Sequence, residues 1–148
     1  PLGGQSRDAW NDAAYTPTRR GKPERRKIVV VDDQDDAREM LKMLLESRDH
    51  TVIDAADGQA ALQLIAKERP DVAFIDIGLP VMTGYEIAQQ IRADRALDDV
   101  MLVALTGYGA PQDIHAARQA GFDEHLIKPA ELAKIEKILA TKKQLEDV

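Results

Sequence analysis

Carboxylate side chains follow two short apolar segments of the sequence. Asp32 and Asp33 come directly after IVVV (residues 28–31), and Asp76 ends the segment DVAFID (71–76). Negative charges placed this close repel, so a positive partner is expected beside them. Oxygen ligands at this density suit Mg²⁺ or Mn²⁺, and Mg²⁺ commonly completes its shell with phosphate oxygens. These residue types predict a divalent-cation site at which Asp76 is the nucleophile towards phosphorus.

Two further polar residues end later apolar segments. Thr106 ends VMLVALT (100–106), and Lys128 lies near the end of EHLIKP (124–129). With Asp76 they supply a nucleophile, a hydrogen-bond donor and a cation, which together suit aspartyl-phosphate chemistry. An acidic pair can also cap a helix, and a threonine or lysine at a strand end can be a turn former or a surface charge. One carboxylate is enough for a cap, so the pair favours the metal site.

The elements that must position these residues follow from the hydrophobic pattern. Apolar runs alternate with helical patterns along the chain. Capping residues mark several boundaries, including Asp57, the Thr83–Glu86 capping box, Pro111 and Gly121. The predicted strands cover residues 28–31, 51–56, 71–76, 100–106 and 124–129, and the predicted helices cover 35–48, 58–69, 86–94, 111–120 and 130–145.

The first predicted helix has one inward stripe and one residue of interest outside it. At about 100° per residue the stripe contains Ala37, Met40, Leu41, Leu44 and Leu45. Met43 falls roughly opposite its centre. An exposed methionine is common, but an adaptable one also suits a docking surface for a helical partner.

Five successive βα units predict an α/β fold with helices on both faces of a parallel sheet. We expect a flavodoxin-like, doubly wound (βα)5 domain over residues 27–145, with five strands in the order 2-1-3-4-5. In such a sheet, ligands bind at the carboxyl ends of the strands where the order reverses, here between strands one and three. Asp32, Asp33 and Asp76 therefore meet at the expected site.

Charge and composition limit the classes of molecule that the chain is expected to bind. Residues 1–27 hold seven Lys/Arg and three Asp/Glu, whereas the rest of the chain is acidic, so nucleic acid is not expected as a partner. Residues 1–26, which have three prolines and no periodicity, are expected to be a disordered tag remnant and basic linker. The chain has no cysteine and no apolar run long enough to span a bilayer. We expect a cytoplasmic location and no membrane contact.

Taken together, VVVDD, FIDIGLPVMTGYE, ALTGYG and HLIKP resemble the receiver domain of two-component response regulators. These motifs extend over most of residues 27–141, in the family's order. The resemblance implies that Asp76 accepts a phosphoryl group from a phosphohistidine. It implies that Asp33 and the backbone carbonyl of Gly78 bind Mg²⁺ directly, that Asp32 binds it through water, and that Asp76 is also a ligand. Thr106 and Lys128 would then bind the phosphoryl group, with Pro129 after a cis peptide bond.

One position departs from the family. Three residues before Lys128, where receivers usually have Tyr or Phe that turns inward with the threonine, this chain has His125. A histidine can rotate as well, but it can also titrate. We expect Thr106 and His125 to form the switch. Tyr108, two residues after the threonine, is expected to shield the site.

The resemblance also implies partners. A histidine kinase or histidine phosphotransfer domain would dock on the first helix, including Met43, and an output partner on the fourth helix and fifth strand. A receiver is not an enzyme beyond its own phosphorylation and dephosphorylation. The chain is expected to be a stand-alone regulator or, as the basic linker favours, the receiver of a hybrid histidine kinase.

Three other functions fit the sequence less well. A haloacid-dehalogenase-like phosphohydrolase would have D-x-D-x-T/V after strand one, which Asp33-Gln34-Asp35 matches only in part, and no cap insertion is present. A flavodoxin-type cofactor module needs a hydroxyl- and glycine-rich loop where this chain has carboxylates. A phosphorylation-independent interaction module with the receiver fold usually lacks an acidic or lysine position, and here all are present.

Overall fold

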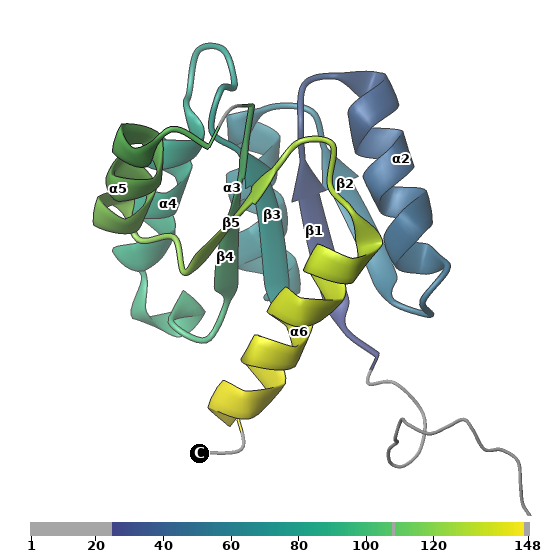
Figure 1. Cartoon of the computed structure of the whole chain (residues 1–148). Coiled ribbons are helices and arrows are strands. Elements are labelled where there is room, and N and C mark those ends of the chain that lie inside the picture. The colour runs from purple at the N-terminus through teal and green to yellow at the C-terminus, as the bar shows by residue number, and fades with distance from the viewer. Residues whose placement is uncertain (1–24, 108, 147–148) are drawn as a thin grey trace, which may run out of the picture.

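A computed structural model of the chain describes residues 25–107 and 109–146. Five parallel strands form one sheet in the order β2-β1-β3-β4-β5, flanked by helices on both faces (Figure 1), which confirms the predicted topology. The strands are β1 (Lys27–Val31), β2 (Thr51–Ala55), β3 (Val72–Asp76), β4 (Met101–Thr106) and β5 (Glu124–Ile127). The helices are α2 (Asp35–Glu46), α3 (Gly58–Glu68), α4 (Gly84–Arg92), the short 3-10 helix η1 (Arg95–Leu97), α5 (Pro111–Ala120) and α6 (Leu132–Glu146).

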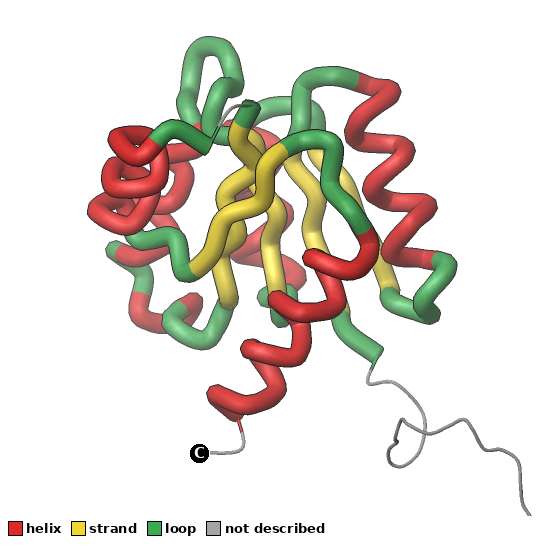
Figure 2. The backbone as a smooth tube through the Cα atoms, viewed as in Figure 1, coloured by secondary structure: helices red, strands yellow, loops and turns green. Residues whose placement is uncertain are grey.

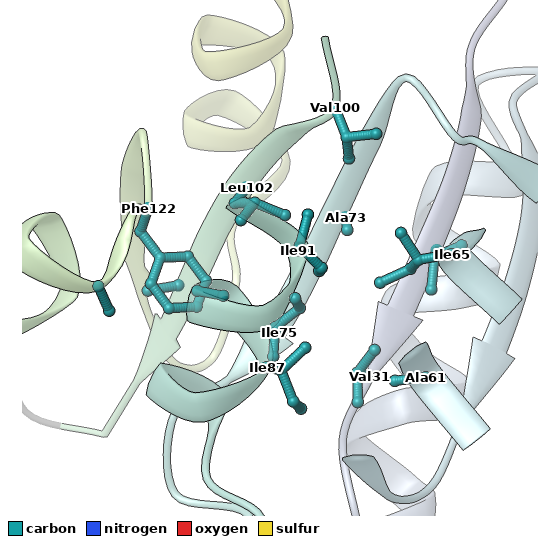
Figure 3. Packing of buried hydrophobic residues seen from close by; sticks show 14 of the residues in the cluster. Val31, Ala61, Ile65, Ala73, Ile75, Ile87, Ile91, Val100, Leu102 and Phe122 are labelled. Atoms are coloured by element: carbon teal, nitrogen blue, oxygen red, sulfur yellow. The ribbon is translucent and has the colours of Figure 1, made fainter. Parts of the chain in front are cut away.

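The central strands are buried on both faces, which explains their continuous apolar runs. Side chains alternate along β1, so Ile28 and Val30 pack with α2 and α6, whereas Val29 and Val31 pack with α3 and α4. Figure 2 shows the resulting layers, with helices before and behind the yellow strands. The side chains of Ile65, Ile87 and Ile91 meet the sheet on the α3–α4 face (Figure 3). This packing fixes the two strand tips that carry the carboxylates.

Capping residues bound the helices as predicted. The Asp57 side chain accepts a hydrogen bond from the backbone N–H of Ala60, and Thr83 and Glu86 form the capping box of α4. Gly121 ends α5 with a φ of 115°, in the left-handed region that favours glycine. These caps set where each loop at the carboxyl edge begins and ends.

The predicted inward stripe of α2 is wrong at one position. Leu41 and Leu45 are buried as expected, but 67% of Met40 is exposed. Met40 lies about 100° round the helix from Leu41, on the side where α2 borders a groove that Leu44 and Lys128 also line. Met43, expected off the stripe, is 62% exposed. The outer surface of α2 therefore presents two methionines rather than one.

Gly84 packs so closely against the end of β3 that it has no room for a side chain. A Cβ atom there would lie 2.6 Å from Ile77 Cα and 2.7 Å from the Asp76 carbonyl oxygen. Gly84→Ala is expected to lower the free energy of unfolding by about 2 kcal/mol, since the backbone beside Asp76 must shift. Urea denaturation measures this loss. Gly107→Ala is the control, because among the described residues no atom outside its two chain neighbours lies within 4 Å of a Cβ there. Equal losses in both variants would contradict this account of Gly84.

The expected start of the domain at residue 27 remains a prediction, because residues 1–24 lie outside the described part of the chain. Arg26 is already buried, and its backbone N–H donates to His50 Nδ1 at 3.0 Å. None of the helices in the described residues combines the length and apolar character that a bilayer crossing requires.

Candidate functional site

Three carboxylates meet at the carboxyl edge of the sheet. Val31 of β1 pairs with Ile75 of β3, so the residues that follow them along the two strands lie side by side. One carboxylate oxygen from each of Asp32, Asp33 and Asp76 lies within 4.8 Å of the others. Asp32 and Asp76 are buried and Asp33 is exposed. The structure thus brings together the three acidic residues that the sequence placed at this edge.

Lys128 lies between two of these carboxylates. Its Nζ is 2.7 Å from Asp32 Oδ2 and 3.0 Å from Asp76 Oδ2. Burial alone would lower the pKa of Lys128, but hydrogen bonds to Asp32 and Asp76 and the charges of both outweigh it, so the pKa is raised. Lys128 therefore stays charged and holds the tips of β1, β3 and β5 together.

Backbone groups hold the remaining carboxylate oxygens of the buried pair. Asp76 Oδ1 accepts a hydrogen bond from the Gly78 N–H at 2.8 Å, and Asp32 Oδ1 accepts one from the Gln34 N–H at 3.0 Å. Lys128 is held in turn, because its N–H donates to the Thr106 carbonyl at 2.8 Å. The Lys128–Pro129 peptide bond is cis, as the resemblance implied. The Asp76 carboxylate and the Lys128 ammonium are thus both held in place by the surrounding backbone.

Thr106 is the least satisfied polar residue of the site. It is 1% exposed, and within the described chain its Oγ1 has no hydrogen-bond partner. A buried hydroxyl without a partner costs roughly 1–3 kcal/mol, so an acceptor at this position would stabilise it. An oxygen-rich anion bound beside Asp76 and Lys128 would supply such an acceptor.

The donor set fits a hard divalent cation. Three carboxylates and the single ammonium of Lys128 leave two negative charges unbalanced among these four side chains. Oxygen ligands and two excess negative charges match Mg²⁺ or Mn²⁺. These cations keep waters and accept phosphate oxygens in the rest of their coordination shell. Asp33 is the exposed member of the cluster, so a cation would reach the cluster from its side.

Other predicted positions are less fully placed. His125 is half-buried on β5, where its backbone pairs with Ala104 of β4, so its part in a switch stays a prediction. Tyr108 lies outside the described residues. Arg38 was not among the predicted site residues, although it donates to the Asp32 carbonyl at 2.9 Å. Its spacing from Asp35 was visible in the sequence, but its contact with Asp54 of β2 was not.

Known proteins share this fold and sequence pattern. The chain is 36% identical over 109 residues to response regulator MprA of Mycolicibacterium vanbaalenii, covering 74% of this chain and 46% of MprA, so it spans less than half of that relative. The structure of chemotaxis protein CheY4 from Vibrio cholerae matches with a TM-score of 0.75 and 30% identity, over 80% of this chain and 98% of CheY4.

A third match carries a metal. The receiver domain of sensor histidine kinase PA1611 from Pseudomonas aeruginosa, which has a magnesium ion coordinated in its active-site cleft, matches with a TM-score of 0.72 and 30% identity over 78% of this chain and 95% of that domain. The family model of the response regulator receiver domain matches residues 28–140. The chain belongs to the response regulator receiver family, a group of signalling domains rather than enzymes in the usual sense.

Proposed function

We propose that this domain accepts a phosphoryl group on Asp76 in a reaction that requires Mg²⁺ or Mn²⁺. Receiver domains act in two-component signalling, and the geometry of the site supports the roles that we propose for its residues. The observation that carries the proposal is the pair of contacts from Lys128 to Asp32 and Asp76, beside the Thr106 hydroxyl, which has no partner among the described residues. Together these groups form a site for a phosphoryl group, whose oxygens would replace protein carboxylates as partners of Lys128 and would give the Thr106 hydroxyl an acceptor.

The residues of the site have different tasks in the transfer, and Asp76 has two. An oxygen of Asp76 attacks phosphorus, and the bond from phosphorus to the donor nitrogen breaks, with its electron pair leaving on the donor imidazole. Asp33, Asp76 and the Gly78 carbonyl would hold the cation directly and Asp32 would hold it through water. When bound, the cation screens the repulsion between carboxylate and phosphoryl oxygens. Lys128 and the Thr106 hydroxyl then stabilise the transferred group.

The loop from β3 to α4 has the properties of a segment that responds to phosphorylation. Val81 in this loop has a φ of 67°, a rare conformation for a β-branched residue, and its side chain is fully exposed. Phosphorylation of Asp76 would bias residues 77–84 and 107–111 and, through Thr106 and His125, the surface of α5 and β5. An output partner would bind that surface.

The phosphodonor would dock beside α2. Receiver domains interact with histidine kinases or phosphotransfer partners, and here a groove of about 370 Å³ lies between α2 and the loop after β5. Met40 lines this groove, and Met43 is exposed on the same helix. Flexible methionine side chains adapt to a helical partner. Asp32 and Lys128 also line this groove, so a partner bound there would lie next to the site.

Incubation with a small acyl phosphate tests the proposed function. In the presence of Mg²⁺, intact-mass analysis is expected to show one added phosphoryl group per chain, and none when a chelator removes the metal. Small phosphate esters are not expected to be turned over. Steady hydrolysis of such esters, or phosphorylation that is equal with and without the metal, would contradict the proposal.

A further inference from the structure

Arg38 of α2 connects three separate elements next to the acidic cluster. Its Nη1 donates to the Asp32 carbonyl at 2.9 Å, its Nε to Asp54 Oδ2 at 2.9 Å, and its Nη2 to Asp35 Oδ1 at 2.7 Å. The side chain of Arg38 is only 16% exposed. Hydrogen bonds to both aspartates raise its pKa, so the guanidinium is always charged. The side chain thus links the end of β1 to α2 and to β2.

The contact with Asp32 bears directly on the metal site. The carbonyl that Arg38 binds belongs to the peptide bond between Asp32 and Asp33. The Asp32 carboxylate is held by Gln34 and Lys128, but within the described residues the Asp33 carboxylate has no hydrogen-bond or ion-pair partner. The orientation of Asp33 is therefore set through its backbone.

We propose that Arg38 is a positioning residue for divalent-cation binding. Its guanidinium is anchored on the Asp54 carboxylate and holds the peptide bond between Asp32 and Asp33 in place. This inference rests on the proposed function, since it assumes that Asp33 binds the cation. Residues that orient metal ligands without touching the metal typically contribute about 10–100-fold to metal affinity. The third partner, Asp35, is 84% exposed, so the contacts to Asp32 and Asp54 carry the effect.

The direction of the change in Mg²⁺ affinity distinguishes a positioning role of Arg38 from an effect of its charge. Arg38 is a cation near an acidic cluster, so loss of its charge alone would strengthen Mg²⁺ binding. Loss of its positioning contacts would weaken it. Lys42 offers a matched control, because its Nζ lies 3.5 Å from Asp54 Oδ1 and it has the same charge on the same helix, but no contact with Asp32.

The test measures Mg²⁺ dissociation constants by calorimetry for the parent, Arg38→Ala, Arg38→Lys and Lys42→Ala, with thermal unfolding of each metal-free protein. Arg38→Ala is expected to bind Mg²⁺ about tenfold more weakly. Arg38→Lys keeps the charge but cannot form the three-way fork, so it is expected to bind more weakly than the parent as well. Lys42→Ala is expected to bind as tightly as the parent or more tightly.

The outcomes discriminate among the explanations. Arg38→Ala that is folded and binds Mg²⁺ as tightly as the parent overturns the inference, even if its unfolding temperature falls, because a purely structural role lowers stability alone. Arg38→Ala that binds Mg²⁺ more tightly than the parent, while Arg38→Lys matches the parent, would also overturn it, in favour of an effect of charge. A parent protein that binds no Mg²⁺ contradicts the proposed function itself.

Discussion

Asp76→Asn is expected to accept no phosphoryl group from a small acyl phosphate under conditions in which the parent accepts one. Asparagine has the same shape and keeps an oxygen that can accept the hydrogen bond from the Gly78 N–H, which lies 2.8 Å from Asp76 Oδ1. Its amide is not a nucleophile towards phosphorus, so the chemistry is lost while the fold is retained. Intact-mass analysis of parent and variant measures the difference.

Asp57→Asn is the matched control for this substitution. Asp57 is an exposed carboxylate that caps α3 through the Ala60 N–H, a role that asparagine also fills. This variant is expected to be phosphorylated like the parent. If Asp76→Asn still gained a phosphoryl group, the acceptor would have to be another residue, and the role given to Asp76 would be wrong.

Lys128→Met is expected to unfold more easily than the parent when no metal is present. Asp32 and Asp76 are 1% and 9% exposed, and both use Lys128 Nζ as a partner. Removing one side of a buried ion pair leaves uncompensated charge, which costs about 3 kcal/mol. Added Mg²⁺ should restore much of this loss, because the cation replaces the missing positive charge and binds only the folded protein. Urea denaturation with and without Mg²⁺ measures both effects.

A second lysine provides the control for Lys128→Met, because the same substitution there removes the same charged group without a buried partner in the described part of the chain. Lys67 lies in the exposed last turn of α3, so Lys67→Met is expected to change stability by no more than about 0.5 kcal/mol. Equal metal-free stabilities for Lys128→Met and the parent would show that the two carboxylates do not depend on this ammonium. A loss that Mg²⁺ fails to reduce would argue against a cation at the same place.

The sequence predicted the fold and the acidic cluster well, for a physical reason. Strands buried on both faces are continuous apolar runs, and the first polar residue after each run marks the carboxyl edge of the sheet. That rule alone located Asp32, Asp33, Asp76 and Thr106. Caps such as Asp57 and Gly121 are local signals too, and each was found where expected.

Contacts between residues that are far apart in the sequence could not be predicted in the same way. Lys128 is 52 residues from Asp76 in the chain, so its place between two carboxylates depends on how β5 and the loop after it lie beside β3. The fork of Arg38 to Asp54 depends likewise on the packing of α2 against β2. Met40 was assigned to the core because periodicity gives the direction of a helix face but does not show that a groove lies beside part of that face.

The central claim is that carboxylates from two adjacent strand tips hold a divalent cation. A Mg²⁺ titration followed through backbone amide NMR signals tests it most directly. The account predicts saturable shifts centred on residues 32, 33, 76 and 78, with little change at the opposite edge of the sheet near Asp71 and Asp99. Signals at the strand tips that stay unchanged at millimolar Mg²⁺, or shifts centred elsewhere, would contradict it.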